Sequence, residues 1–564
     1  MSFDPQQFKA QFPLFGQPEN QQLIYLDNAS TTQKPQCVLD AITHFYLHHN
    51  GNAQRASHRL AREATHSVLR TRQLAADFLG ASSAQNIVFT SGATAGLNMI
   101  AHGLSELCTA DDEIVLSHEA HHANLLPWQR LAQQQQCRLT FLPSEQGLSC
   151  WQQWRSVVSE RTRIIALSAA SNVLGHVTAL DVIAQIKQQF PRVIVVVDAS
   201  QLVSHIPLAV EQWQCDFAVC SAHKMYGPTG IGLLYGRTEW LNSLSPLLVG
   251  GEMVDTVTLH SSTFVENVER FEAGTSSLSA IAGLGACIEF WQKQDRAAMR
   301  QYEQELTAYL YCSLAELCQH HTQLQLVSSA KNNIGIATIV SNTSLALSDL
   351  ALWLDEHDIA VRVGDHCAQP LWHSLGQSFS LPQAAHKGLR ISLAAYNTRE
   401  DVDALIRAIT GFFDHHIANI EASTKVLPTA IAEINDDFSS LHIDDLLAAT
   451  SWQKRFKILQ QWGRCIRHKP SVRQDVYRVN GCETAVWLQH YQKDERHYFL
   501  IDSDSTVIKG LAALLLLKCH GQTRELILSL DIEEEYQRLG LQKHLSPSRM
   551  NGFVALLSAF KGFL

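Results

Sequence analysis

Short apolar runs rich in β-branched residues alternate with longer amphipathic stretches between residues 20 and 240. Several of these runs are apolar throughout rather than at every second position, which is typical of strands buried on both faces of a sheet between helices. The pattern therefore predicts an α/β domain with a mostly parallel sheet. The predicted strands are Asn86–Thr90, Glu113–Ser117, Arg163–Ser168, Val193–Asp198, Asp216–Ser221 and Ile231–Tyr235.

Composition divides the rest of the chain into further predicted parts. A helical segment at about 279–320 and strands near 335–341 and 389–394 predict a smaller α+β domain on the same core. A more polar stretch with one proline predicts a connection, and the segment after it is long enough for an independent α+β domain. In that last segment we expect helices at 452–463 and 506–519 and strands at 474–491 and 496–502. The predicted parts are 1–412 (a large domain at about 20–265, and a small domain from the N-terminal segment plus about 270–412), the connection 413–447 and the domain 448–564.

The charge balance and the lack of long apolar runs exclude two classes of protein. Lysine and arginine total 44 while aspartate and glutamate total 54, so the formal net charge is −10. Binding of nucleic acid through bulk positive charge is therefore excluded. No apolar run approaches the ~20 residues of a membrane helix, and the first residues do not have the pattern of a secretory signal. We expect a cytoplasmic protein that contacts neither nucleic acid nor membrane directly.

The segment SAHKMYGPTGIG at residues 221–232 follows a predicted strand and contains Lys224. Buried lysines are rare because desolvation of the charge is costly, and a lysine with a lowered pKa is the usual nucleophile in Schiff-base chemistry. Ser221 and His223 could bind an anion beside it, and the glycines that follow permit close approach of the backbone. The alternative is a surface lysine before a Gly-Pro turn, which this segment alone does not exclude.

Other polar residues follow the predicted strands at their carboxyl ends, where ligands bind in open α/β sheets. Asp198 could pair with a protonated pyridine nitrogen, as pyridoxal 5′-phosphate (PLP) requires, or it could be a helix N-cap. Gln201 could then reach a ring oxygen. The turn SGATAGLN could bind a phosphate through Thr94 and helix amides, or it could be a plain strand–helix junction. His121 could stack on a flat cofactor, although a lone histidine there is more often structural.

Together these segments resemble the fold-type I PLP-dependent enzymes of the class-V aminotransferase superfamily, and above all the SufS/CsdA type of cysteine desulfurase. The matching motifs occur in the family's order and cover nearly all of residues 1–412. They are YLDNASTTQKP (25–35), HHANLLPWQ (121–129), SNVLGHV (171–177), DASQ (198–201), SAHKMYGPTGIG (221–232), RFEAGTSS (270–277), RVGDHCAQPLW (362–372) and LRISLAAYNT (389–398).

The resemblance implies a role for each matching residue in binding PLP and L-cysteine. Lys224 would hold the cofactor covalently, and Asp198 would pair with its ring nitrogen. Arg390, with help from Arg362, would bind the substrate carboxylate. Thr275 matches a position that reaches the phosphate of the other subunit, so a homodimer is implied. The remaining assignments are Gln201 to the phenolic oxygen, Thr94, Ser221 and His223 to the phosphate, His121 stacked on the ring and Asn172 over it.

Three segments depart from the family pattern. The phosphate turn reads SGATAG where the family more often has Arg-Gly-Thr-Thr-Glu, and Ala120 replaces the usual acidic residue before His121. Residues 50–60 match the family's Asn-Val-His-Arg stretch only loosely. These differences concern individual contacts rather than the class of reaction.

Cys367 in RVGDHCAQPLW decides which PLP reaction is expected. The chain has 13 cysteines and no Cys-x-x-Cys pair, so neither a zinc ribbon nor another metal site is predicted, and cysteine chemistry would use single thiols. Cys367 matches the family's persulfide-forming residue, with basic neighbours favouring the thiolate and Asp365 opposing it. The resemblance implies conversion of L-cysteine to L-alanine with a persulfide on Cys367. The alternatives are a selenocysteine lyase and a catalytically silent sulfur-relay scaffold.

Residues 448–564 resemble the SufE-like sulfur-acceptor proteins. Cys482 occupies the acceptor position, with a small buried core residue as the alternative. The resemblance implies that Cys482 takes sulfur from Cys367 and delivers it to a downstream protein, which would be an iron–sulfur scaffold or a thiolation factor for tRNA or another sulfur-containing cofactor. A tethered acceptor works at ~mM effective concentration if the connection spans the gap. The matching stretches are WQKRFKILQQWGR (452–464), VNGCETAVW (479–487), IDSDSTVIKGLAALLL (501–516) and HLSPSRMNGF (544–553), with Asp502, Asp504, Lys509 and Arg549 in register, while CIRHKP (465–470) replaces the usual Leu-Pro-x-Leu-Pro.

Overall fold

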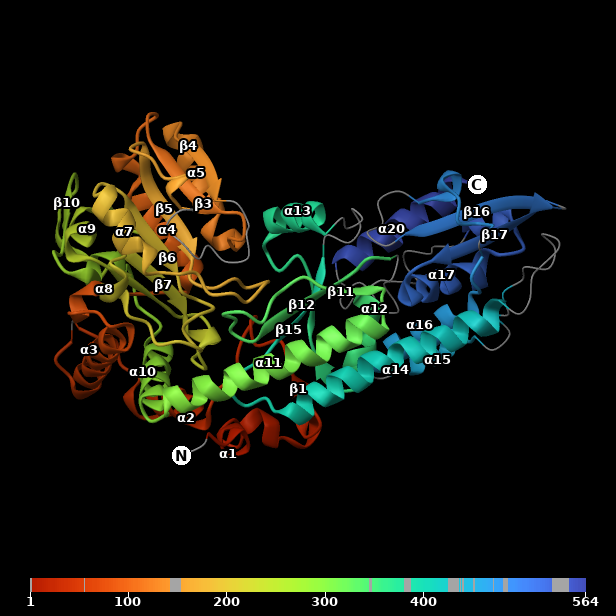
Figure 1. The fold of residues 1–564 in the computed structure, drawn as a ribbon, viewed down its shortest axis with the longest axis horizontal. Helices are drawn as coiled ribbons and strands as arrows, with labels where there is room; N and C mark the ends of the chain where they lie inside the picture. The colour runs from red at the N-terminus through yellow and green to blue at the C-terminus, as the bar shows by residue number, and fades with distance from the viewer. Residues whose placement is uncertain are drawn as a thin grey trace. The chain divides into compact units, whose positions relative to one another are not determined.

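The structure, a computed structural model, describes most of the chain and divides it into two units (Figure 1). The first unit comprises Met1–Val340, Leu354–Leu381 and His386–Ile406, and the second comprises Ser341–Trp353, Pro382–Ala385 and Arg407–Leu564. The described residues are 3–54, 56–142, 154–343, 347–379, 387–424, 436, 438, 441–449, 452–469, 471–479, 485–493, 495–529 and 547–563.

A seven-stranded sheet lies at the centre of the first unit, with strand order β2-β8-β7-β6-β5-β3-β4 (Figure 1). Neighbouring strands are parallel except at β8, which is antiparallel to both β2 and β7. The predicted mostly parallel sheet is therefore confirmed. Its strands are β2 (Ile87–Thr90), β3 (Glu113–Ser117), β4 (Arg138–Leu142), β5 (Thr162–Ser168), β6 (Ile194–Asp198), β7 (Phe217–Ser221) and β8 (Gly232–Gly236).

Both faces of this sheet are buried, as the continuous apolar runs predict. Alternate residues of β5 point to opposite faces, so that Ile165 and Leu167 join one hydrophobic cluster while Ile164 and Ala166 join the other. The helices α3 (Arg59–Leu79), α7 (Val182–Gln189) and α10 (Leu278–Gln292) contribute to the first cluster, and α4 (Ala93–Gly103) and α5 (Leu126–Gln135) to the second.

A four-stranded sheet of order β11-β12-β15-β14 belongs to the smaller domain. The N-terminal segment joins it, because the amide of Ser392 donates to the carbonyl of Leu26 at 2.8 Å. The predicted helical segment at 279–320 is two helices, α10 and α11 (Arg296–His320), and Asp295 caps the second by accepting from the amides of Ala297 and Ala298. The strands are β11 (Leu324–Leu326), β12 (Ile336–Ser341), β14 (Arg362–Gly364) and β15 (Gly388–Ser392), and β1 (Ile24–Tyr25) pairs with β13 (Ile359–Ala360).

Shorter elements complete the first unit, and one long helix continues past residue 412, the predicted end of the first part of the chain. Helix α14 (Arg399–Thr424) continues beyond residue 412 into the segment predicted as a connection. The shorter elements are α1 (Pro5–Lys9), α2 (Gln36–His44) with the π turn Phe45–His49, α8 (Val210–Trp213), α9 (Thr238–Ser243), β9 (Val254–Val257), β10 (Ser262–Phe264) and α13 (Gln369–Ser378), and α12 (Leu347–Asp355) lies largely in the second unit.

The second unit packs helices on a three-stranded antiparallel sheet of order β16-β17-β18. Helix α17 (Thr506–Cys519) has the bounds that its apolar run predicts. The predicted strand at 474–491 is correct only in part, because residues 475–477 form a 3₁₀ turn and the strand begins at Val486. No helix in the described part of the chain is long and apolar enough to span a membrane. The other elements are α15 (Ile443–Ala448), α16 (Trp452–Cys465), β16 (Val486–Lys493), β17 (Arg496–Ser503), β18 (Gln522–Thr523), α18 (Arg524–Ser529) and α20 (Pro547–Gly562).

Two glycines allow α16 and α17 to approach each other closely. A Cβ atom on Gly463 would collide with the carbonyl oxygen of Thr506, and one on Gly510 would collide with that of Leu459. Gly463→Ala should therefore lower the unfolding free energy of the second unit by at least about 2 kcal/mol, as overpacking does in a close-packed core. Thermal unfolding of the full chain measures this, with Gly562→Ala, whose Cβ would meet nothing within 4 Å, as the matched control. Equal melting of both variants would contradict the contact.

Candidate active site

Lys224 lies just past the carboxyl end of β7, and Asp198 is the last residue of the neighbouring strand β6. Asp198 is buried and accepts a hydrogen bond from the amide of Ser200 at 3.0 Å. Burial lowers the pKa of Lys224 to about 8, and Asp198 opposes this shift. The charges of Arg390, Cys367 and Asp27 also act on Lys224. The structure therefore gathers four groups from distant parts of the sequence around one amine.

The turn between β2 and α4 forms a cradle with several donors at the same edge of the sheet. Gly92 has a φ of 148°, and the amide of Ala93 donates to the Ser221 hydroxyl at 2.8 Å. Thr94 is exposed in the first turn of α4, where backbone N–H groups and the helix dipole favour an anion. Burial and the positive charge of Lys224 lower the pKa of His223 to about 4, so its imidazole is neutral at physiological pH.

His121 and Gln201 are both fixed by hydrogen bonds to backbone groups. The Nδ1 atom of His121 accepts from the amide of Ala123 at 3.0 Å, which leaves Nε2 as the protonated atom of the neutral ring. Burial and Lys224 lower the pKa of His121 to about 4. The side-chain amide of Gln201 donates to the carbonyl of Ala29 at 2.8 Å, so it is joined to the N-terminal segment.

Arg390 is 3% exposed and is surrounded by acceptors. Its Nη1 atom donates to the carbonyl of Asn172 at 2.9 Å, and its Nη2 atom donates to Asp27 Oδ1 at 3.1 Å and to the Ser30 hydroxyl at 2.6 Å. Its Nε atom is buried and has no hydrogen-bond partner among the described residues. Arg362 reaches the same carboxylate, with Nη2 2.9 Å from Asp27 Oδ2. The two predicted carboxylate-binding arginines therefore meet at Asp27.

Cys367 presents an exposed thiol on a turn whose backbone is held in place. His366 and Cys367 have φ values of 51° and 57°, a left-handed conformation that is uncommon for residues other than glycine. Asn172 Nδ2 donates to the carbonyl of His366 at 2.8 Å, and the amide of His122 donates to the carbonyl of Cys367 at 2.7 Å. The amide of Cys367 donates to Asp365 Oδ1 at 3.1 Å. These bonds fix the backbone that carries the thiol.

Sequence reasoning missed the part that residues 27–34 play in this site. The carbonyl of His223 accepts from the amide of Thr32 at 3.0 Å and from Lys34 Nζ at 3.1 Å. Burial lowers the pKa of Lys34 to about 8. Asp27, described above, belongs to the same segment. The motif YLDNASTTQKP contains all of these residues, so it was a usable signal, but residue type alone does not show which partners they have.

Among the described residues, one predicted site residue, Thr275, does not lie with the groups around Lys224. Thr275 is exposed and lies beside Glu272 and Gly274, in a hollow that contains none of the residues around Lys224.

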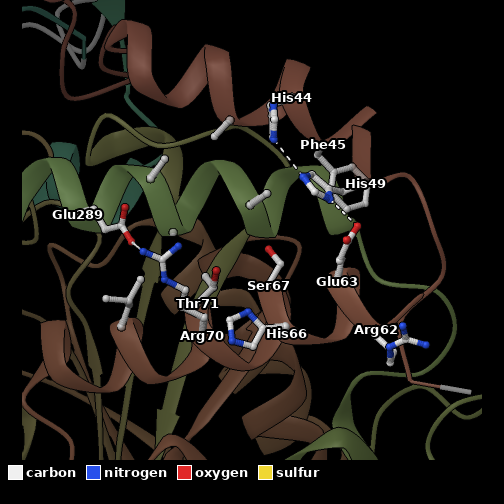
Figure 2. Close-up of a pocket in the computed structure, with 15 residues that line it drawn as sticks. His44, Phe45, His49, Arg62, Glu63, His66, Ser67, Arg70, Thr71 and Glu289 are labelled. Atoms are coloured by element: carbon white, nitrogen blue, oxygen red, sulfur yellow. Dashed lines mark hydrogen bonds and ion pairs between the residues drawn. The ribbon is translucent and has the colours of Figure 1, made fainter. Parts of the chain in front are cut away.

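A separate cavity of about 490 Å³ lies between α2, α3 and α10, and His44, His49, Glu63 and Arg70 are among its lining residues (Figure 2). None of the residues predicted to bind the cofactor or substrate lines this cavity.

Cys482 lies outside the described residues, and the same unit holds a charged cluster around Asp502. Asp502 is fully buried and accepts from Arg473 Nε at 2.7 Å and from Lys469 N at 2.9 Å, and Lys509 Nζ lies 2.9 Å from it. Burial alone would raise the pKa of Asp502, but the hydrogen bonds and charges of Arg473 and Lys509 hold it well below its usual range. Arg473 also pairs with Asp504 at 2.6 Å. The side chain of Arg549 is outside the described part.

Comparison with known proteins places both parts of the chain. Residues 24–405 match the aminotransferase class-V family, and residues 441–563 match SufE, the Fe-S metabolism associated domain. The chain belongs to the class-V aminotransferase family. Within that family it is a PLP-dependent enzyme of the cysteine desulfurase type, with a SufE domain on the same chain.

Three relatives support this placement. A probable cysteine desulfurase of Vibrio cholerae serotype O1 is 38% identical over 407 residues, which cover 71% of this chain and 96% of that protein. A cysteine desulfurase of Yersinia pseudotuberculosis serotype O:1b is 37% identical over 72% of this chain and 98% of that protein. The crystal structure of the cysteine desulfurase CsdA (S-sulfonic acid) from Escherichia coli has a TM-score of 0.66 at 33% identity, over 73% of this chain and 99% of that one.

The residues at the site fit PLP, the cofactor of this family of desulfurases. An amine of lowered pKa, a buried carboxylate and an anion-binding helix start lie at one sheet edge, and these match the aldehyde, ring nitrogen and phosphate of the cofactor. The unpartnered Nε atom of Arg390 leaves a buried donor available for a carboxylate. Lys224, Asp198, Ser221, His223 and Thr94 are the residues that would hold the group.

Lys224→Ala should abolish covalent capture of PLP, because the replacement has no amine at this position. Borohydride reduction followed by peptide mass mapping measures the capture directly, and the absorbance of bound cofactor should be lost in parallel. Lys187→Ala, which removes another lysine of the large domain with a lowered pKa, is the control. Full labelling in Lys224→Ala would eliminate this lysine as the attachment site.

The rate of this capture should depend on pH in a way that follows from the surroundings of Lys224. Only the neutral amine reacts, so capture by cofactor-free protein should accelerate as the pH rises through about 8 rather than through 10.5. Asp198→Asn removes a charge that raises the pKa of Lys224, so its midpoint should move to lower pH. Timed borohydride quenching at a series of pH values gives both midpoints. A wild-type midpoint near 10 would contradict the burial of the amine.

Proposed function

We propose that this cysteine desulfurase transfers the sulfur of L-cysteine to Cys367 as a persulfide and then to Cys482 in the SufE domain of the chain. The observation that supports the first transfer is the exposed thiol of Cys367, held on a fixed turn beside the groups that surround Lys224. The sulfur then serves the assembly of iron–sulfur clusters or another sulfur-containing cofactor through a downstream acceptor protein.

The substrate is held at its carboxylate by two arginines, and Lys224 acts on it at Cα. The carboxylate binds Arg390, whose Nε atom has no other partner among the described residues, with help from Arg362. When bound, PLP supplies the electron sink that makes loss of the Cα proton feasible. The lowered pKa of Lys224 leaves a substantial fraction of its amine neutral near pH 8, so the freed amine can accept that proton. Asn172 fixes the carbonyl of His366 and so holds the thiol-bearing turn over the site.

Cys367 then acts on the sulfur atom of the substrate. Its thiolate attacks Sγ of L-cysteine, an S–S bond forms, and the Cβ–Sγ bond breaks. The carbon fragment keeps the electron pair of the broken bond, takes up a proton at Cβ, regains a proton at Cα from Lys224 and leaves as L-alanine. The turn that carries this thiol has two consecutive residues with positive φ, and Cys367 is exposed on it.

The second transfer moves the outer sulfur between the two units. The Cys482 thiolate attacks the outer sulfur of the Cys367 persulfide, so one S–S bond forms while the other breaks and releases Cys367 as a thiolate. The SufE domain also carries the cations Arg473 and Lys509, and cations of this kind favour a thiolate or persulfide anion. We also propose a homodimer, in which Thr275, exposed in the single chain, completes the phosphate site of the partner.

Two other functions remain alternatives to this proposal. A selenocysteine lyase would use the same cofactor and the same carboxylate-binding arginines, and relative kcat/KM for the two substrates distinguishes it. A catalytically silent scaffold would relay sulfur without turnover. The lowered pKa of Lys224 and the burial of Asp198 beside it argue against silence, because the cofactor attachment requires a reactive amine.

External reductant should restore turnover in the Cys482→Ser variant but not in the Cys367→Ser variant. Cys367→Ser should reduce L-alanine formation at least about 100-fold with or without reductant, because the nucleophile itself is missing. Cys482→Ser should form one persulfide on Cys367 and then stall, and dithiothreitol should restore turnover by removing that sulfur directly. Persulfide-trapping peptide maps after incubation with L-cysteine measure which thiols carry sulfur and in what order.

Cys312→Ser is the control, because Cys312 is an exposed thiol of the first unit on α11. It should keep wild-type turnover and the wild-type persulfide pattern. If Cys482→Ser turns over at the wild-type rate without reductant, the relay is wrong. Equal loss of activity in both site variants, with dithiothreitol present, would make Cys482 a structural residue instead.

A further inference from the structure

The turn that carries Cys367 is attached to two loops at the edge of the large sheet. The carbonyl of Cys367 accepts from the amide of His122 at 2.7 Å. The carbonyl of His366 accepts from Asn172 Nδ2 at 2.8 Å. His122 follows β3 and Asn172 follows β5, and these two strands are parallel neighbours in the sheet. The position of the turn therefore depends on the spacing between the two loops.

The loop after β3 makes two further contacts with the chain beyond Cys367. The amide of Gln369 donates to His122 Nε2 at 3.3 Å. The Ser374 hydroxyl lies 3.3 Å from His118 Nδ1. This loop therefore holds both the thiol-bearing turn and the helix α13 that follows it.

A buried pair of side chains joins the two loops to each other. His176 Nε2 lies 2.6 Å from Glu119 Oε2, and the two side chains are 11% and 8% exposed. The amide of Ser171 donates to the carbonyl of His176 at 3.0 Å, so His176 is also joined to the residue before Asn172. Glu119 lies three residues before His122 in the other loop. The pair thus closes a ring of contacts that runs through both loops and the thiol-bearing turn.

This pair takes no part in the transfer steps of the proposed function. The family usually has an acidic residue directly before His121, where this chain has Ala120, and Glu119 is one position earlier. The loop of this chain thus keeps an acidic residue but pairs it with His176. Buried polar side chains are costly when their hydrogen bonds are lost, so the pair favours the arrangement in which the two loops stay together.

We propose that Glu119 and His176 are positioning residues, which hold the two loops at the spacing that places Cys367 for attack on the substrate sulfur. The proposal rests on the proposed role of Cys367 as the first sulfur acceptor. The physical reason is that bond formation is fast only when the reacting atoms are held in the right geometry, and a displacement of about 1 Å can slow a reaction ~100-fold. The pair acts only through the backbone that it holds.

A variant without either partner tests this, because it breaks the link between the loops and leaves no buried charge unpaired. Glu119→Met combined with His176→Leu should speed deuterium uptake by residues 362–372 of the holoenzyme. It should also slow persulfide formation on Cys367 at least about tenfold. Mass spectrometry of the quenched protein measures the uptake, and timed persulfide-trapping peptide maps after mixing with L-cysteine measure the rate.

Two further variants separate positioning from a general loss of stability. His176→Gln keeps a donor for the carboxylate of Glu119, so uptake and rate should return to near the wild-type values. Glu303→Met combined with His205→Leu removes another buried histidine–glutamate pair of the first unit, in which Nδ1 and Oε1 are 3.2 Å apart. This control should leave both measurements unchanged.

A wild-type rate of persulfide formation in the variant without Glu119 and His176 would overturn the proposal, whatever its deuterium uptake. An equal loss of rate in the control variant, or no recovery in His176→Gln, would assign the effect to folding stability and would also overturn it. If Cys367 of the wild-type protein receives no sulfur, the proposed function fails. The deuterium uptake then still decides whether the pair holds the turn, because it involves no sulfur chemistry.

Discussion

A guanidinium that is 3% exposed needs a counter-charge, and Arg390 obtains it from Asp27. Isolated buried charges are costly to desolvate, so this pair constrains everything attached to it. Asp27 begins a segment that runs to Lys34. In this segment the carbonyl of Ala29 accepts from the side-chain amide of Gln201, and Lys34 Nζ donates to the carbonyl of His223. The ion pairs of Asp27 therefore hold the N-terminal segment at the site. This segment links the two arginines to the backbone beside Lys224.

The described parts of the two units are organised by different physical features. Cys367 is on a turn whose strained backbone is over-determined by bonds from Asn172, His122 and Asp365, which is the usual condition for strain to persist at a functional site. In the second unit the described feature is electrostatic, since buried Asp502 organises Arg473 and Lys509 around one carboxylate. The described feature is thus backbone geometry at Cys367 and a buried charge cluster in the second unit.

Much of the fold could be predicted because burial leaves a pattern in the sequence. The strand ending at Asp198 and the helix α17 were predicted almost to the residue, since both consist mostly of apolar residues. Strand β4 was missed because it lies at the sheet edge and is half exposed, so its pattern is mixed. The single predicted helix at 279–320 is two, because the N-cap at Asp295 interrupts a helical pattern that continues on both sides.

For the site, the sequence by itself determined which residues follow the strands, including Lys224 three positions after Ser221 and Asp198 at the end of its own strand. Such positions depend on local spacing, and the carboxyl ends of parallel strands necessarily share one edge. Only the tertiary structure decided that Asp27 joins Arg390 and Arg362, and that His122 holds Cys367. Those partners are hundreds of residues apart, and their contact depends on how the smaller domain packs against the large sheet, which local pattern does not encode.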